Sequence, residues 1–372
     1  MKFLIITHVE HKSNGTSFSA YAPYVREMNL WLKHVEDLII VAPQTSKIKS
    51  EIDLDYKHEN IKFSAIPSIQ FTDLKNTLVS FFKIPIILIG IYKACKKADH
   101  IHLRCPGSIG LLGCLVQIFF PKKNKTAKYA GNWDPKAKQP LSYNIQKWLL
   151  SNTFLTKNMS VLVYGDWPDK TQNIKPFFTA TFKRNEIEPI ELRNYSSGLQ
   201  FVFVGTLVEG KRPLLTIQIV ERLQKKGSKV RLDIFGDGVL RGELEDFVKN
   251  KGLNDIVKFH GNQNKQNVKE ALKTAHFSIL PSKSEGWPKA LAEAMFFGAI
   301  PIATSISCVP DMLGYGKRGI LIDPDLDKAL AEIERHLKDT ENLTQMSQNA
   351  ANWSQNYTLE RFETEIVKLL KA

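Results

Sequence analysis

The chain has 372 residues, 43% of them hydrophobic, which allows two globular domains of ordinary size. Its formal net charge of +13 at pH 7 favours an acidic partner, such as a nucleotide, a phosphate-bearing substrate or an anionic membrane. The cysteines show no C-x-x-C pair, which argues against a zinc site and for reduced thiols in a cytosolic protein. The opening MKFLIITHV turns polar too soon for a signal peptide.

The first half of the chain alternates continuous apolar runs with helical spacing. A buried strand is predicted at residues 2–9, then a polar loop around Asn14 and Gly15, then a helix over residues 21–33. Further strands are predicted at residues 38–42, 61–66, 100–103, 127–130 and 161–164, and helices at 77–97, 109–120 and 141–155. This alternation predicts a doubly wound parallel sheet.

Three features of the first half concern membranes. The most apolar run, residues 84–92, is shorter than the ~20 residues that span a bilayer, so no spanning segment is expected. The helix at 141–155 has an apolar stripe that suits a membrane interface, although a core-facing helix is the commoner explanation. Residues 101–150 carry eight basic residues and only one acid, which fits either a solvated surface or an anionic membrane. The stripe consists of Tyr143, Trp148, Leu149 and Phe154, beside Lys147.

The second half repeats the alternation. A polar segment with several prolines, residues 166–197, is interpreted as containing the linker, and new strands are predicted from residue 200 onward. We therefore predict two Rossmann-like domains, residues 1–190 and 191–372. The last helix, residues 359–370, has spare length with which it could pack back on the first domain.

One stretch of the second half, residues 281–304, stands out as a ligand site. Its pattern predicts a strand end, a polar loop with Glu285, a short helix after Pro288 that carries Glu293, and a second strand after Gly298. Ligands of open α/β sheets bind beyond the carboxyl ends of the strands, where a helix amino terminus offers N–H groups to phosphate.

Two other loops of the same half are predicted to converge on this site. Gly205, Gly236 and Gly238 allow close backbone approach, and Lys211 and Arg212 supply cations. Each signal is weak alone, since a Gly-Asp-Gly is more often a turn and a Lys-Arg pair is usually solvated. Together they predict binding of a phosphorylated ligand.

These motifs resemble a known family. Residues 201–324 are similar to the carboxyl-terminal domain of glycosyltransferase family 4. The resemblance is carried by the order FVGTL, K, IFGDGVLRGELE, VKFHG and LPSKSEGWPKALAEAMFFGAIPIAT. Members are retaining enzymes of the GT-B fold, in which two Rossmann-like domains face each other across a cleft. The glutamate pair, Glu285 and Glu293, is the most diagnostic part, and the first half fits only in general pattern.

The resemblance implies roles for individual residues. Glu285 would contact hydroxyls of the donor sugar, Glu293 would accept hydrogen bonds from the ribose, and Lys211 would neutralise the leaving diphosphate, where developing charge is best stabilised. The base would lie near residues 261–263. The implied donor site comprises Gly205, Thr206, Lys211, Arg212, Gly236, Asp237, Gly238, Gly261, Gln263, Glu285, Gly286, Trp287, Pro288, Lys289 and Glu293.

The chain departs from the family pattern at three places. Thr206 stands where an arginine is usual, so either Arg212 substitutes for it or Lys211 acts alone. Asp311 occupies the usual place of a later glutamate. The histidine common on the acceptor side is missing after residues 127–130, where Asp134 is the candidate catalytic group, although a loop-capping role is about equally expected. The acceptor-side candidates are Asn14, Gly15, Arg104, Asn132 and Asp134.

The resemblance implies a hexosyltransferase-type enzyme. The cysteines favour a cytoplasmic location, and the basic first domain with the helix at 141–155 adds the option of a peripheral site on the inner membrane face. The enzyme would move a sugar from a nucleotide-diphosphate donor to a saccharide or lipid-linked acceptor. The basic first domain and the helix at 141–155 suggest the lipid-linked acceptor, used in surface polysaccharide or glycolipid assembly, and a soluble small acceptor is the alternative. No metal or cofactor is expected, because the D-x-D element at Asp53 to Asp55 lies in a predicted solvated loop. No nucleic acid is expected, because aromatic and basic residues do not interleave and the basic charge lies away from the glutamate motif. The alternatives are a GT-B sugar-nucleotide epimerase or hydrolase and a non-enzymatic nucleotide- or nucleic-acid-binding protein.

Overall fold

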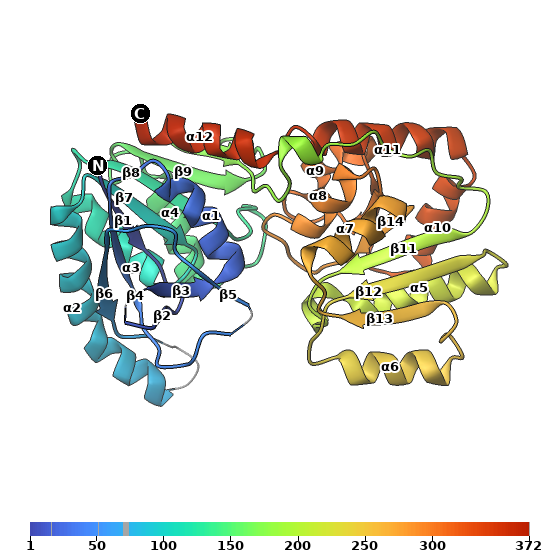
Figure 1. Cartoon of the computed structure of the whole chain (residues 1–372), viewed down its shortest axis with the longest axis horizontal. Helices are drawn as coiled ribbons and strands as arrows, with labels where there is room; N and C mark the ends of the chain where they lie inside the picture. Colours follow the sequence, from blue (N-terminus) through green and yellow to red (C-terminus); the bar gives the residue numbers. More distant parts are fainter. Residues whose placement is uncertain (16, 51, 70–73, 372) are drawn as a thin grey trace. The chain divides into compact units, whose positions relative to one another are not determined.

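The computed structural model describes residues 1–15, 17–50, 52–69 and 74–371, which form two compact units (Figure 1). The first contains residues 1–178 and 362–372, and the second residues 179–361. This division lies before the predicted boundary at residue 190 because the intervening segment packs on the second unit. The ring of Phe182 lies 4.8 Å from that of Phe296 and 4.9 Å from that of Phe297, and Lys269 forms an ion pair with Glu186 at 3.3 Å.

A seven-stranded parallel sheet organises the first unit, in the order β10-β9-β8-β7-β1-β4-β6. Chain order runs outward from β1 to β6 on one side and from β7 to β10 on the other, so the predicted doubly wound sheet is confirmed. The strands are β1 (Lys2–Ile6), β4 (Asp37–Pro43), β6 (Ile61–Ile66), β7 (His100–Cys105), β8 (Asn124–Tyr129), β9 (Met159–Tyr164) and β10 (Ile174–Phe177).

Two strand groups of the first unit were not predicted. β10 lies inside the segment interpreted as a linker, where only Ile174 and Phe177 face the core, so the strand lacks a continuous apolar run. A small antiparallel sheet of β2 (Lys12–Ser13), β3 (Phe18–Tyr21) and β5 (Asp53–Asp55) replaces parts of the predicted polar loops. Asp53 is not simply solvated, because it forms an ion pair with Lys12 that holds this sheet.

The helices of the first unit cover both faces of its sheet (Figure 1). The crossovers through α2, α3 and α4 run in one direction along the sheet and that through α1 runs in the other, which places α1 on the opposite face. α3 packs against both α2 and α4, so these three form one helical layer. The helices are α1 (Ala22–Leu32), α2 (Leu74–Lys97), α3 (Ser108–Val116), η1 (Gln117–Phe119) and α4 (Leu141–Ser151).

The last helix, α12 (Leu359–Lys371), belongs to the first unit from Phe362 onward. The Phe362 ring lies 5.3 Å from that of Phe177 and 5.6 Å from that of Phe178. Glu363 accepts hydrogen bonds from the Lys33 ammonium at 2.7 Å and from His34 Nε2 at 2.9 Å. Apolar and ionic contacts together therefore fix this helix on the first unit.

Buried histidines should make the first unit sensitive to acid. Burial lowers the pKa of His11 and of His100 from 6.5 to about 4, so both are neutral when folded and protonate more readily when unfolded. We expect the contribution of these two histidines to the free energy of unfolding to be complete above pH 6.5. It should be lost as the pH falls from 6.5 to 4, because the unfolded chain binds more protons than the folded chain in that range. Urea titrations at several pH values measure this. The expectation fails if stability is flat across that window, or if His100→Gln shows the same slope as the parent chain.

A six-stranded parallel sheet organises the second unit, in the order β13-β12-β11-β14-β15-β16. The direction of winding reverses between β11 and β14, so the loops that follow these two strands flank the switch point. The strands are β11 (Leu199–Val204), β12 (Val230–Phe235), β13 (Val257–Gly261), β14 (Phe277–Leu280), β15 (Ile300–Thr304) and β16 (Ile320–Ile322).

Amphipathic helices bury apolar faces against this second sheet. Phe201, Phe203 and Phe277 are fully buried, and Ile217 of α5 and Met295 of α8 pack against the same core. The helices are η3 (Glu209–Lys211), α5 (Pro213–Lys225), α6 (Arg241–Asn250), α7 (Lys265–Thr274), α8 (Lys289–Phe296), α9 (Val309–Met312), η4 (Gly314–Gly316), α10 (Leu326–Leu337) and α11 (Thr340–Ser354). Both Rossmann-like halves are thus present.

Candidate functional site

The candidate site lies at the switch point of the second sheet. Residues 205–212 follow β11, residues 281–288 follow β14, and both loops start at the carboxyl ends of adjacent parallel strands. A parallel sheet brings such loops to the same edge, which is where open α/β sheets bind ligands. The loop at residues 205–212 is therefore a neighbour of the loop that carries Glu285, as the sequence predicts.

An ion pair joins the two loops at their centre. The Lys211 ammonium donates to Glu285 Oε1 at 2.5 Å, and the Glu285 side chain is only 9% exposed whereas that of Lys211 is 29% exposed. A buried carboxylate needs such a partner, since its desolvation is otherwise costly. The two residues predicted to act on the sugar and on the diphosphate are thus in direct contact.

Arg212 joins the same two loops through hydrogen bonds to the backbone. Its guanidinium Nη1 donates to the carbonyls of Pro281 and Ser282 at 3.2 and 3.3 Å, and so ties the β11 loop to the β14 loop. Its backbone is left-handed, with φ of 50°, directly before Pro213 begins α5. Lys283 N–H donates to the Gly210 carbonyl at 2.8 Å and adds a further tie.

Cys308 forms a hydrogen bond with the backbone of the β14 loop. Its Sγ donates to the Gly286 carbonyl at 2.8 Å. Burial, followed by the nearby charges of Asp311 and Glu285, raises the pKa of Cys308 to about 12. The thiol is therefore a hydrogen-bond donor and not a nucleophile. Asp311 itself lies on the short helix α9, beside this loop segment.

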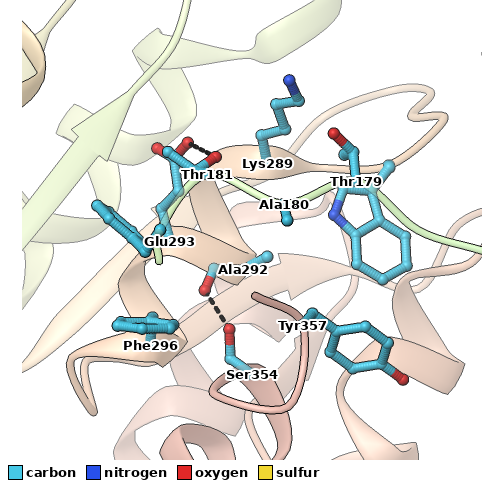
Figure 2. A pocket seen from close by; sticks show the side chains of 11 residues that line it. Thr179, Ala180, Thr181, Lys289, Ala292, Glu293, Phe296, Ser354 and Tyr357 are labelled. Carbon is cyan, nitrogen blue, oxygen red and sulfur yellow. Dashed lines mark hydrogen bonds between the residues drawn. The ribbon is translucent and has the colours of Figure 1, made fainter. Parts of the chain in front are cut away.

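Glu293 is a half-buried residue of α8 and lines a small pocket of about 20 Å³. Figure 2 shows the Thr181 hydroxyl pointing toward the Glu293 carboxylate, to which it donates at 2.7 Å. Ser354 Oγ donates to the Ala292 carbonyl at 2.6 Å across the same pocket. No local motif predicts Thr181, because it lies 112 residues before its partner in the chain. The remaining lining residues are Thr179, Ala180, Phe182, Trp287, Lys289, Phe296 and Tyr357.

α8 presents its amino terminus to the β14 loop. The helix begins at Lys289 with Pro288 at the N-cap, where no side chain caps the first N–H groups. Trp287 stacks on Trp353 at 6.0 Å and contacts the ring of Tyr357 at 5.8 Å, which anchors the loop on α11. Backbone N–H groups in this setting can bind an anion.

The glycines after β12 are required by close backbone approach. A Cβ on Gly236 would lie 2.0 Å from the Gly205 carbonyl oxygen, and one on Gly238 would lie 2.5 Å from that of Leu207. Gly236 also has a φ of 134°, a conformation open mainly to glycine. This turn therefore packs directly against the β11 loop, next to the exposed Thr206.

Arg241 is a cation at this edge that the sequence reasoning did not select. Its guanidinium donates to Asp237 at 3.0 Å and to Glu245 at 2.8 Å, and it lies beside Gly261, whose added Cβ would come within 3.1 Å of Nη1. The motif G-D-G-x-x-R, with the arginine in the first turn of α6, could have identified Arg241 from the sequence. Gln263 is exposed and donates to the His260 carbonyl at 2.8 Å.

The acceptor-side candidates lie in the first unit, in three separate settings. Arg104, at the end of β7, lies 5.3 Å from the Tyr24 ring and 3.8 Å from Glu27. Asn132 accepts from Asp134 N–H at 2.8 Å, and Asp134 accepts from Lys136 N–H at 2.8 Å, so both side chains cap their loop. Asn14 and Gly15 form the turn between β2 and β3, where Asn14 Oδ1 accepts from Ser17 N–H.

His8 is a first-unit residue that the sequence reasoning missed. It follows β1 at the switch point of the first sheet, and a Cβ on Gly107 would lie 2.9 Å from its Nδ1. Desolvation, followed by the charge of Arg104, lowers the pKa of His8. It lies inside the strand predicted at residues 2–9 but two residues after the observed end of β1, so no local pattern marked it as a residue at the switch point. Within the described ranges, no group of three His, Cys, Asp or Glu side chains is arranged to bind a metal.

Part of this chain is similar in sequence to known glycosyltransferases. A relative from Campylobacter jejuni, named GalNAc-alpha-(1->4)-GalNAc-alpha-(1->3)-diNAcBac-PP-undecaprenol alpha-1,4-N-acetyl-D-galactosaminyltransferase, is 30% identical over 45% of this chain and 47% of its own length. The chain spans less than half of the length of this relative, and 37% of the length of a putative colanic acid biosynthesis glycosyltransferase from Escherichia coli.

Two solved structures match the fold over essentially the whole chain. The lipopolysaccharide outer core galactosyltransferase WaaB, in its apo form, has a TM-score of 0.71 at 16% identity and covers 100% of this chain and 99% of its own. Anabaena HepE, solved in complex with UDP and glucose, has a TM-score of 0.67 at 13% identity and covers 100% of both chains. Residues 185–353 match the family model for glycosyl transferases group 1. The chain therefore has the GT-B fold, and most of its second unit matches the family model for glycosyl transferases group 1.

Proposed function

We propose that this chain is a retaining glycosyltransferase that moves a sugar from a nucleoside diphosphate donor to a saccharide or lipid-linked acceptor in surface polysaccharide or glycolipid assembly. The observation that carries the proposal is the Lys211–Glu285 pair at the switch point, beside the uncapped amino terminus of α8. The C. jejuni relative's name, with its PP-undecaprenol acceptor, supports the lipid-linked acceptor class.

The ion pair suits departure of a diphosphate. A lysine ammonium has three N–H donors, and Glu285 uses one of them, so the others remain able to contact phosphate oxygens. Because Glu285 already holds the cation, little reorganisation is needed when negative charge develops on the leaving group. N–H groups of residues 286–289 add positive potential at the same point.

The sugar and the nucleoside would be held by the two glutamates. Glu285 contacts sugar hydroxyls through the carboxylate oxygen that does not meet Lys211, and Glu293 accepts from the ribose hydroxyls. The leaving phosphate takes the proton of the acceptor hydroxyl on the same face of the sugar. That route retains the anomeric configuration without an enzymic nucleophile.

The acceptor would bind the first unit. His8 and Arg104 are two polar groups near the carboxyl ends of β1 and β7, which flank the switch point of the first sheet, and Arg104 offers a cation to a phosphate-bearing acceptor. We place the enzyme at the cytoplasmic face of a membrane, where a lipid-linked acceptor and a soluble donor are both available.

Glu293→Ala is expected to weaken donor binding by about 10- to 100-fold, which corresponds to loss of charge-assisted hydrogen bonds to the ribose. Isothermal titration with the preferred nucleotide sugar measures the Kd. Thr181→Val is the matched variant, because it removes only the hydroxyl that orients Glu293 and should weaken binding less. An unchanged Kd in Glu293→Ala would refute this assignment.

The transfer reaction itself is tested with a purified nucleotide sugar and an undecaprenyl-diphosphate-linked saccharide. We expect donor-dependent lengthening of the acceptor, with the product linkage keeping the donor's anomeric configuration by NMR. Inversion would contradict the retaining mechanism. Donor hydrolysis or epimerisation without any transfer would favour the rival enzyme class.

A further inference from the structure

An unusually apolar surface covers the helical layer of the first unit. Of the twenty large hydrophobic side chains that are exposed among the described residues, thirteen lie on α2, α3, η1, α4 and the turn after α4. They include Phe82 at 81% exposure, Phe119 at 72% and Trp148 at 61%. We call this surface the apolar face: Leu78, Val79, Phe81, Phe82, Ile86, Ile89, Tyr92, Leu115, Phe119, Leu141, Ile145, Trp148 and Phe154.

The apolar face is contributed by neighbouring helices. α3 packs against both α2 and α4, and Tyr92 of α2 lies 6.5 Å from the ring of Phe119 after α3. On α4, Leu141, Ile145 and Trp148 recur at helical spacing and point outward, whereas Leu149 is buried in the core. Monomeric soluble proteins rarely expose so large an apolar surface unless it binds a partner or a membrane.

α2 lies against the sheet. Its segment Thr77–Lys97 is long and apolar enough to span a membrane by length and composition, which is longer than the run noted in the sequence. Ile87, Ile91 and Cys95 on its other face are, however, fully buried in the core beneath it. A helix held in this way presents its exposed face parallel to a bilayer surface.

The charges around the apolar face identify the partner. Between residues 74 and 158 the only acidic residues are Asp99 and Asp134, and both are engaged, by Lys2 N–H and Lys136 N–H respectively. Exposed cations flank the apolar side chains at the end of α2, after η1 and beside Phe154: Lys93, Lys96, Lys97, Lys122 and Lys157. Apolar side chains bordered by lysines match the acyl and headgroup layers of an anionic leaflet.

We propose that the apolar face binds the surface of an anionic lipid bilayer, with the side chains of α2 and α4 in the acyl boundary and the flanking lysines on the headgroups. A second copy of the chain fits less well, because a symmetric contact would oppose one set of lysines to the other. The proposal supplies the lipid partner of the function proposed above, but vesicle binding needs no donor, so either proposal can fail alone.

Flotation with vesicles of phosphatidylcholine, with or without phosphatidylglycerol, tests the proposal on the full chain. We expect binding to the anionic vesicles that falls with salt, and at least ~10-fold weaker binding by Phe81→Ser/Phe82→Ser. The matched control is Val239→Ser/Tyr315→Ser, which removes two exposed apolar side chains of the second unit and should bind like the parent chain. Lys93→Glu/Lys96→Glu/Lys97→Glu should lose the preference for anionic lipid.

Three outcomes would overturn the proposal. They are no binding of the parent chain to anionic vesicles, equal binding by Phe81→Ser/Phe82→Ser, and a dimer in light scattering that this variant dissociates. The last result would assign the apolar face to a second copy. Circular dichroism and nucleotide-sugar binding of each variant show that it is folded, because these exposed side chains lie outside the donor site.

Discussion

Lys211→Ala is expected to lower kcat by about 10²- to 10³-fold, the usual effect of removing one preorganised donor from a developing negative charge. The same change leaves the Glu285 carboxylate, only 9% exposed, without the ammonium that contacts it at 2.5 Å. Some loss of stability should therefore accompany the loss of rate. Initial rates of transfer at saturating donor, with a thermal melt of each variant, separate the two effects.

The chain offers a matched control in the same two loops. Lys283 also pairs with a glutamate across them, but its partner Glu209 is 83% exposed, so this pair should matter little. Lys283→Ala is expected to stay within about twofold of the parent kcat. Because Lys211 and Glu285 act as a unit, Lys211→Ala/Glu285→Gln should be no slower than the slower single variant. A Lys211→Ala enzyme as fast as Lys283→Ala would remove Lys211 from the mechanism.

Lys128→Ala is expected to destabilise the first unit by about 3–5 kcal/mol, because it removes one partner of a buried charge network. The Lys128 side chain is 0% exposed and its ammonium donates to the Phe178 carbonyl at 2.9 Å. It also lies 3.9 Å from Glu27 and over the rings of Phe177 and Phe362, at 4.4 and 5.5 Å. This lysine therefore helps to hold α12 on the first unit.

Urea denaturation and hydrogen exchange measure that effect. Amides of α12 should exchange faster in Lys128→Ala, as the Phe362 ring loses the cation beneath it. Lys157→Ala is the control, since that exposed lysine lies over the exposed ring of Phe154, at 5.1 Å, and should change stability by well under ~1 kcal/mol. Equal stabilities for the two variants would contradict this role for Lys128.

The fold could be predicted from the sequence where burial is complete. β1, β4 and β11 read as strands because each contains a continuous apolar run, at residues 3–6, 38–43 and 201–204, that is almost entirely buried. β10 could not be read in this way, because an edge strand with two buried residues has no such run. Residues 179–190 belong to the second unit because Phe182 and Glu186 contact residues distant in the sequence, and such contacts leave no local sequence pattern.

The candidate site was predictable where backbone geometry dictates residue type. Gly236 and Gly238 are glycines because the neighbouring loop leaves no room for a Cβ, so they appear in the sequence as a motif. The contact between Lys211 and Glu285 follows from two adjacent strands and could be expected from strand order alone. The use of Arg212 on backbone carbonyls could not, because it depends on the course of the loop. Thr181 and His8 become visible only through their neighbours.

The apolar face was only half visible from the sequence. The stripe predicted on residues 141–155 includes Trp148 and Phe154, which are exposed, but also Leu149, which is buried. The apolar surface of α2 was not predicted, because its apolar run was compared only with the length that spans a bilayer. The surface depends instead on how many apolar side chains of α2 the sheet leaves exposed.

The central claim, that the switch point of the second unit binds a nucleotide sugar, is tested most directly by calorimetric titration with UDP-, GDP- and ADP-sugars. The account predicts that one nucleotide class binds with one site per chain, and that both Lys211→Ala and Glu293→Ala weaken it at least ~10-fold while Lys283→Ala does not. Failure of every nucleotide sugar to bind, or binding with equal affinity to all three variants, would contradict it.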